Sequence, residues 1–241
     1  MLRIGHITPS SNIVLEPLTY AMSRDLPVTH HFTRIAVRRI DRDAETEAQF
    51  ADAHLLAAAS LLAEAPLDVL TWNGTSASWR GQEHDSRVCA AVTRRCAIPM
   101  TSATLGLQAA FAAHGWRRVA LAVPYTAALA GEIAVEYRRW GLDVVGAAVL
   151  GLVENTDFAA VPASRIAALL REAAAFRPDC IAVVCTNFAA APLVEAMERE
   201  LGCAIVDSVA VTLWHACRQG GLMPRLTGWG RLLAGAAPGQ A

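Results

Sequence analysis

Short apolar stretches alternate with longer amphipathic ones along almost the whole chain. Apolar runs that end in polar or turn-forming residues predict strands at 2–8, 33–38, 67–73, 97–101, 118–123, 143–148, 179–185 and 203–207. The amphipathic stretches predict helices at 13–23, 43–64, 82–96, 103–114, 127–140, 163–175, 189–201 and 209–219. This alternation predicts an α/β fold in which helices cover both faces of parallel sheets.

The segment 43–64 shows a clear helical period. Its apolar positions recur at three- and four-residue spacing, and they are Ala44, Ala48, Ala51, Leu55, Ala58 and Leu62. A single stripe of this kind predicts one amphipathic helix that covers a sheet.

Three pairs of segments repeat in the same order along the chain. Each member joins a short apolar strand to a turn rich in hydroxyl groups. The pairs are 2–11 with 118–126, 68–76 with 179–187, and 98–102 with 204–208. Ordered repetition of this kind indicates an internal duplication.

The duplication predicts two pseudo-symmetric, flavodoxin-like parallel-sheet halves with the active site between them. We place the first half at 1–110 plus 215–241, with the C-terminal tail packed on it, and the second half at 111–214. Ligands of such sheets bind at the carboxyl ends of the strands, where exposed amides and helix N-termini favour anions. The polar turns of the two halves therefore predict a shared cleft for a small carboxylate.

The two halves differ at one position that matters for chemistry. The repeat places Cys185 at the end of one strand and Gly74 at the equivalent point of the other half. A helix N-terminus stabilises a thiolate and lowers the pKa of a cysteine from its usual value of about 8.5, which would make Cys185 available as acid or base. The alternative is a buried cysteine that acts as a small apolar side chain. One thiol serves one face of a carbon atom, whereas two opposed thiols serve both.

Further candidates are hydroxyl, amide and phenol side chains beside the polar turns. They are Ser10, Asn12, Thr75, Ser76, Tyr125, Asn155 and Thr186. Each has an ordinary alternative, because serine, threonine and asparagine commonly cap helices, a tyrosine can be half-buried, and Asn155 falls in an expected polar loop. As a group, they are suited to bind a carboxylate or to stabilise an oxyanion.

The composition excludes several kinds of catalysis. The chain contains no lysine, so Schiff-base and pyridoxal-phosphate mechanisms are excluded. Its histidines lack the spacing of metal ligands, and the glycine-rich turn of dinucleotide-binding proteins is missing, so we expect no metal and no cofactor.

Charge and hydropathy limit the kinds of partner that the chain can bind. A formal net charge of -1 gives no basic surface for nucleic acid, and no apolar run is long enough to cross a membrane. The six cysteines show no close pairing, which is typical of reduced thiols, and we expect a cytoplasmic protein. A homo-oligomer is compatible with the sequence.

Together these residues resemble the aspartate/glutamate racemase superfamily, in the branch of maleate cis-trans isomerases and arylmalonate decarboxylases. Racemases and isomerases of that superfamily carry a cysteine in each half, whereas the decarboxylases keep only the second and have Gly-Thr-Ser in the first, as residues 74–76 do here. In contrast, residues 9–12 and Asn155 look like the substrate-binding residues of the isomerases. The resemblance covers nearly the whole chain.

The resemblance implies a cofactor-independent enzyme that decarboxylates a substituted malonate. Cys185 would protonate the resulting enediolate from one side, and either Trp72 or Leu15 would supply an apolar wall. The alternatives are a maleate isomerase or a racemase-type isomerase, and a dicarboxylate-binding protein without turnover.

Overall fold

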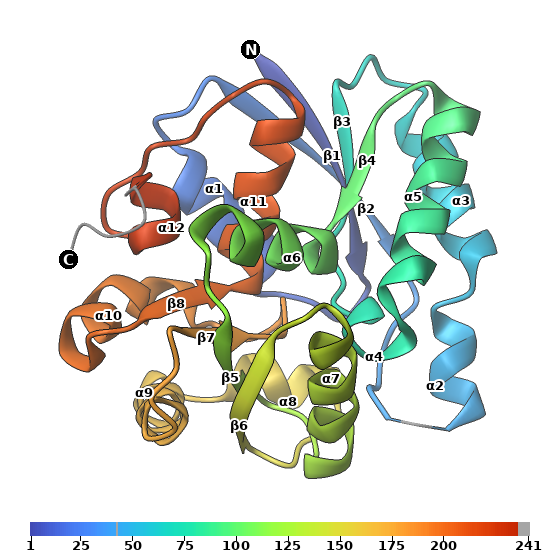
Figure 1. Cartoon of the computed structure of the whole chain (residues 1–241). Coiled ribbons are helices and arrows are strands. Elements are labelled where there is room, and N and C mark those ends of the chain that lie inside the picture. The colour runs from blue at the N-terminus through green and yellow to red at the C-terminus, as the bar shows by residue number, and fades with distance from the viewer. Residues whose placement is uncertain (42, 236–241) are drawn as a thin grey trace.

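The computed structural model describes residues 1–41 and 43–235, which form two four-stranded parallel sheets (Figure 1). The strands are β1 (Leu2–Pro9), β2 (Val28–Ile35), β3 (Val69–Trp72), β4 (Met100–Ser102), β5 (Arg118–Val123), β6 (Asp143–Val149), β7 (Cys180–Val183) and β8 (Ala204–Asp207). The first sheet has the order β2-β1-β3-β4 and the second the order β6-β5-β7-β8. The same order in both sheets confirms the predicted α/β fold with two related halves.

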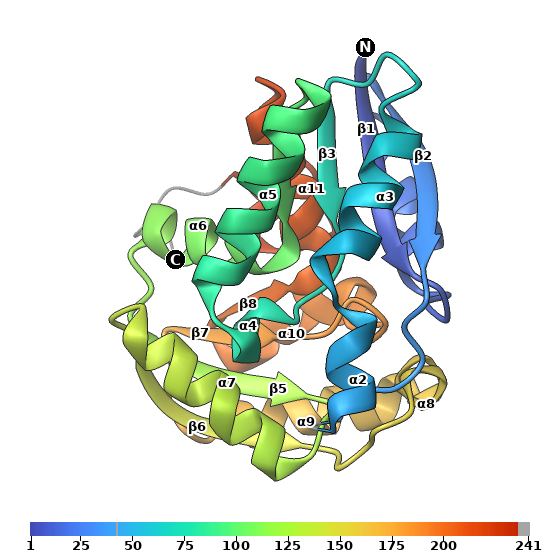
Figure 2. The same ribbon diagram turned by 90° about the vertical axis from the view of Figure 1, so that its right-hand side faces the viewer.

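Helices cover both faces of each sheet (Figures 1 and 2). In the first sheet, α1 and α11 lie on one face and α3 and α5 on the other, while in the second α7 lies opposite α9 and α10. The helices are α1 (Leu15–Ser23), α2 (Ala44–Gln49), α3 (Asp52–Leu62), α4 (Ala77–Arg80), α5 (Gln82–Cys96), α6 (Ala103–His114), α7 (Ala127–Arg139), α8 (Asn155–Ala160), α9 (Ala163–Ala174), the 3-10 helix η1 (Ala191–Leu193), α10 (Val194–Leu201), α11 (Ser208–Gln219) and α12 (Arg231–Ala234).

The helices that follow the last strand of each half, α6 and α11, pack against each other and join the halves. A Cβ on Gly106 of α6 would lie only 3.1 Å from the carbonyl oxygen of Val211 and 3.3 Å from Cβ of His215 on α11. Glycine therefore allows the two helix backbones to approach closely. One cluster of buried apolar side chains runs through both halves.

The second strand is displaced from its predicted position. The prediction was 33–38, but β2 is Val28–Ile35. Beyond Ile35 the chain leaves the sheet, because the backbone N–H of Val37 donates to Ser10 Oγ at 3.2 Å and its carbonyl accepts from Ser11 Oγ at 2.6 Å. These side-chain bonds replace a strand partner, and they bring Val37 over the end of β1.

The predicted helix 43–64 is wrong as a single element, because it is divided into α2 and α3. The division lies at Phe50 and Ala51, where Ala51 has an extended backbone with φ −60° and ψ 137°. Ala44 and Ala48 of the predicted stripe are exposed, while the Phe50 ring is buried. The regular spacing of apolar residues therefore gave no sign of the break between α2 and α3, at which the Phe50 ring is buried.

The C-terminal tail contacts more than the first half. The backbone N–H groups of Gly228 and Arg231 donate to Glu195 and Glu198 of α10, at 3.1 and 2.7 Å. The helix α12 also contacts β8 of the second half and α11, which covers a face of the first sheet. The tail therefore contacts both halves. The predicted tail includes residues 236–241, which lie outside the described residues.

Three short helices were not predicted: α4, α8 and α12. Asn155 is the first residue of α8, and it was expected in a loop. Within the described residues, no helix combines the length and apolar character that crossing a membrane requires.

Candidate active site

A small cavity lies where the carboxyl ends of strands from both sheets meet. Its lining residues are Pro9, Val37, Ile40, Phe50, Trp72, Gly74, Thr75, Ser76, Trp79, Tyr125, Asn155, Cys185, Thr186 and Asn187. The cavity volume is about 20 Å³, about the space that one water molecule needs. Both halves contribute to the lining, as the predicted site between them requires.

A contact between the halves lies beside the cavity, at the lining residues Ile40 and Asn155. Residue Arg39 forms a β-bridge with Glu154, and their side chains form an ion pair of 3.4 Å. On either side of this bridge, Ile40 N donates to Val153 O at 2.9 Å and Asn155 N donates to Arg38 O at 3.0 Å. A segment of the first half is thereby bonded to the start of α8 in the second.

Cys185 lies just beyond β7 and is 2% exposed. Burial raises the pKa of its thiol to about 12, although hydrogen bonds with Tyr125 and the Asn187 backbone act in the opposite direction. We expected the helix start to lower this pKa, and that expectation is wrong because desolvation outweighs the local donors. The group is a neutral thiol at physiological pH, which makes it a proton donor and a poor nucleophile.

The first half contributes hydroxyl groups to the same cavity. Thr75 and Ser76 are both buried, and Thr75 Oγ1 lies 3.4 Å from the Tyr125 hydroxyl. Ser76 precedes α4, but its side chain makes no capping hydrogen bond. Burial raises the pKa of Tyr125 well above its usual value, so its phenol is protonated and can donate a hydrogen bond. The three side chains form a neutral cluster of donors.

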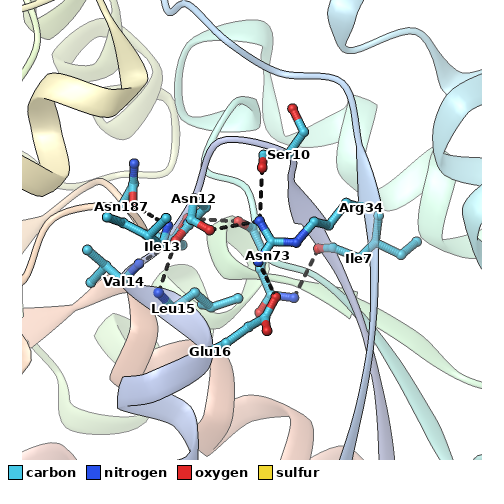
Figure 3. Close-up of polar contacts among 11 residues, drawn as sticks. Ile7, Ser10, Asn12, Ile13, Val14, Leu15, Glu16, Arg34, Asn73 and Asn187 are labelled. Atoms are coloured by element: carbon cyan, nitrogen blue, oxygen red, sulfur yellow. Dashed lines mark hydrogen bonds and ion pairs between the residues drawn. The ribbon is translucent and has the colours of Figure 1, made fainter.

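Thr186 and Asn12 link the halves. The hydroxyl of Thr186 donates to the carbonyl of Asn73 at 2.8 Å and accepts from Asn12 Nδ2 at 3.1 Å. Asn12 Oδ1 also accepts from the backbone N–H groups of Val14 and Leu15, at 3.0 and 2.9 Å, which satisfies the start of α1 (Figure 3). Asn12 therefore acts as a helix cap and an inter-half bond, and it does not line the cavity.

Asn187 and Asn155 form a second link. Asn187 Nδ2 donates to the carbonyl of Asn155 at 2.6 Å. Its Oδ1 accepts from Ile13 N at 3.1 Å (Figure 3). Asn155 Nδ2 donates to Ser11 Oγ at 2.7 Å. Both amides line the cavity while their polar atoms tie the turn after β1 to the second half.

Ser10 is exposed and lies outside the cavity, with its hydroxyl against the backbone of Val37. Its turn is fixed by Arg34, which donates to the carbonyls of Ser10 and Asn12 at 2.9 and 2.8 Å and pairs with Glu16 (Figure 3). Of the predicted residues, the structure brings Gly74, Thr75, Ser76, Tyr125, Asn155, Cys185 and Thr186 to the cavity, and it places Ser10 and Asn12 behind it.

One side of the cavity is apolar. Val37, Ile40, Phe50 and Trp79 line it, and within the described part of the chain no charged side chain does. Of the two walls that we considered, Trp72 lines the cavity, whereas Leu15 is buried elsewhere in the core. The sequence pattern did not indicate these positions, because they lie beyond β2 or in short helices. Among the described residues, no three histidine, cysteine or acidic side chains gather as metal ligands would.

Asp207 is a further buried group near the site. Its Oδ1 caps α11 by accepting from Val209 N and Ala210 N, at 2.8 and 3.0 Å, whereas Oδ2 has no partner among the described residues. Burial raises the pKa of this carboxyl to about 7. Its negative charge raises the pKa of Cys185 further.

Comparison with known proteins relates the chain to two kinds of enzyme. The model of the arylmalonate decarboxylase family matches residues 27–233. A maleate isomerase of Nocardia farcinica (strain IFM 10152) is 26% identical over 96% of this chain and 95% of the relative.

Solved structures agree in fold. A mutant of the Nocardia farcinica maleate cis-trans isomerase with a covalently bound succinylcysteine intermediate matches with a TM-score of 0.90 at 24% identity, covering 98% of this chain and 99% of the other. Unliganded arylmalonate decarboxylase matches with a TM-score of 0.82 at 24% identity, covering 98% and 100%. At these identities the structural matches establish the fold.

Proposed function

Because the chain belongs to the arylmalonate decarboxylase family, we propose that it decarboxylates a substituted malonate without a cofactor and protonates the product from one side. The observation that carries this proposal is the asymmetry of the cavity. A single neutral thiol, Cys185, lies at the end of β7, and Gly74 takes the equivalent place after β3.

The first step is the loss of carbon dioxide. Breaking the carbon–carbon bond leaves its electron pair on the substrate, where the retained carboxylate takes it up as an enediolate. Thr75, Ser76 and Tyr125 are placed to donate hydrogen bonds to the enediolate oxygens. One such donor typically lowers the barrier by about 3 kcal/mol.

The apolar side of the cavity favours the same step. Val37, Ile40 and Phe50 offer no hydrogen bonds from their side chains to a carboxylate that lies against them. A charged group loses stability when it is desolvated in this way, while neutral carbon dioxide does not. The site thus combines donors for the retained carboxylate with an apolar wall for the departing one.

The second step is proton transfer. The Cys185 thiol gives its proton to the carbanion carbon, and the resulting thiolate regains a proton from water. A thiol whose pKa is about 12 is protonated before each turnover, so no separate activation is needed. Because the glycine side holds no acid, the product is a single enantiomer.

A maleate isomerase is the second candidate, and the 26% identity to the Nocardia farcinica enzyme over nearly the whole chain favours it. A related isomerase structure contains a succinylcysteine intermediate, which is formed by a cysteine nucleophile. Here Gly74 offers no nucleophile, and the raised pKa of Cys185 opposes the thiolate that addition to a double bond needs.

Three substrates distinguish these activities. The purified protein is incubated with phenylmalonate, maleate and aspartate, while carbon dioxide release, fumarate formation and loss of optical rotation are followed. Our proposal predicts carbon dioxide from phenylmalonate and no fumarate. Formation of fumarate without carbon dioxide would establish the isomerase instead.

A further inference from the structure

The side chain of Trp72 occupies the place where the first half would otherwise present a residue-74 side chain. Trp72 ends β3, and positions two apart project to the same side of an extended chain. A Cβ on Gly74 would lie 2.1 Å from Cζ2, 2.2 Å from Cε2 and 2.6 Å from Nε1 of the indole. Both residues line the cavity, so the ring fills the space over the glycine.

The indole N–H of Trp72 is buried without a hydrogen-bond partner among residues 1–41 and 43–235. The side chain is 1% exposed, and buried polar groups nearly always have a partner in folded proteins. Trp79 Nε1 shares this property, but its ring is partly exposed. An unpaired donor at a ligand cavity indicates that a ligand supplies the acceptor.

The position of this donor indicates which ligand group it meets. Nε1 lies beside residue 74, directly before the hydroxyl donors of Thr75 and Ser76. A carboxylate held by those hydroxyls is the nearest acceptor that a substrate would bring. Carboxylate oxygens also accept several hydrogen bonds each, so a further donor can be accommodated.

We propose that Trp72 is a substrate-binding residue that donates its Nε1–H to the carboxylate retained as the enediolate. This assignment rests on the proposed function. An indole nitrogen is a donor only and does not titrate, so it stabilises charge without delivering a proton. Trp72, Thr75 and Ser76 of the first half thus bind the carboxylate together with Tyr125, and Cys185 of the second half protonates the carbanion.

The ring also restricts the substrate. It fills the space over Gly74, so the larger substituent of the malonate has to lie away from that glycine. The assignment therefore predicts aryl- or alkyl-substituted malonates as substrates and excludes covalent addition from the glycine side.

The affinity test uses the Cys185→Ser chain, in which we expect ligands to bind while turnover is slow. Adding Trp72→Phe removes the N–H and keeps an aromatic ring, and calorimetry then measures the affinity for phenylacetate and phenylmalonate. We expect both affinities to fall about 10- to 100-fold, as for loss of a hydrogen bond to a charged group. The matched control is Trp116→Phe, since Trp116 stacks on His114 outside this cavity and its change should leave both affinities unaltered.

A spectroscopic signature separates binding from a structural effect. In protein with ¹⁵N-labelled indoles, the Trp72 Nε1–H resonance is identified by its loss in Trp72→Phe. Phenylacetate should move this resonance downfield in the Cys185→Ser chain, because the proton enters a hydrogen bond to a carboxylate. An unchanged resonance at saturation would overturn the assignment. The assignment would also be overturned if none of phenylacetate, phenylmalonate and maleate bound.

The outcomes separate this assignment from the proposed function. If phenylmalonate releases no carbon dioxide but Trp72→Phe still weakens carboxylate binding, the proposed reaction fails and the assignment stands. If carbon dioxide is released and the affinities are unaltered in Trp72→Phe, only the assignment fails.

A test of the packing needs no ligand. Gly74→Cys should lower the free energy of unfolding, because its Cβ would overlap the Trp72 ring. This decrease should be smaller when Trp72→Ala is also present. Urea denaturation of the two single variants and the double variant measures this coupling. Equal losses from Gly74→Cys in both backgrounds would show that the indole does not occupy the space over residue 74, and would overturn the assignment.

Discussion

The turn after β3 and the turn after β7 have equivalent places in the two sheets but different tasks. In the first, Thr75 and Ser76 contribute hydroxyl groups to the cavity lining, and the Trp72 ring fills the space over Gly74, which has no side chain. In the second, Cys185 carries the only thiol that lines the cavity among the described residues, whereas the hydroxyl of Thr186 makes its hydrogen bonds with the first half. Under the proposed mechanism, a few residues in one turn of a duplicated fold would separate recognition from proton delivery.

The largest expected effect comes from the thiol. Cys185→Ser should lower kcat by about 10²- to 10⁴-fold, because a hydroxyl is a much weaker acid, while the affinity for phenylmalonate stays within a few-fold. Steady-state kinetics and calorimetry measure the two quantities. Unchanged turnover would show that the second turn is not the proton donor, and a pure binding protein would show no turnover in either chain.

Removing a donor from the first turn should have the next largest effect. Thr75→Val keeps the size of the side chain but removes the hydroxyl, and we expect kcat to fall about 10²- to 10³-fold. The free energy of unfolding should change little, because this hydroxyl's contact with Tyr125 is long, at 3.4 Å. A variant with full kcat would contradict the assignment of recognition to the first half.

The capping residues of α6 and α11 provide a comparison that depends on pH. Ser102 caps α6 with a neutral hydroxyl, whereas Asp207 caps α11 with a buried carboxyl whose pKa is raised from 3.8 to about 7. A raised folded-state pKa gives stability that is fully present below about pH 4 and is lost as the pH rises to about 7.

Asp207→Asn keeps the capping acceptor and removes this titration. Relative to the unaltered chain, the free energy of unfolding of the variant should therefore rise by about 4 kcal/mol between pH 4 and pH 8, since raising a pKa from 3.8 to about 7 is worth about 1.4 kcal/mol per unit. Urea denaturation at both pH values measures the difference. A difference that does not vary with pH would mean that Asp207 is not protonated by burial.

The smallest expected effect concerns the second turn's structural task. Thr186→Val should lower the free energy of unfolding by about 1–3 kcal/mol, since it leaves the Asn73 carbonyl and Asn12 Nδ2 without their bond across the halves. The matched variant Thr75→Val should lower the free energy of unfolding by less than Thr186→Val does. If Thr75→Val and Thr186→Val lower the free energy of unfolding by the same amount, the proposed division of tasks between the turns is incorrect.

The sequence predicted the fold well where the local signals were strong. Buried strands such as β5 and β7, and the repeated turns after them, follow from apolar runs that end in polar residues. The single thiol and the glycine opposite it follow from the repeat. Both depend on local pattern and on comparison within the chain.

Other features depend on tertiary contacts that no local pattern contains. Val37 leaves the sheet because Ser10 and Ser11 bind its backbone, and Phe50 turns inward at a break that the helical period conceals. The pKa of Cys185 rises because burial outweighs its neighbours, and only the folded chain fixes that balance. The overlap of Trp72 with the space over Gly74 likewise follows only from the folded structure.

The central claim is that a lone thiol delivers a proton to one face of an enediolate. The direct test is decarboxylation of 2-methyl-2-phenylmalonate in D₂O, with chiral chromatography and mass spectrometry of the product. We predict a single enantiomer of 2-phenylpropionate that carries one deuterium at the α-carbon, and product formation that is about 10²- to 10⁴-fold slower with Cys185→Ser. A racemic product from the unaltered chain would contradict the account.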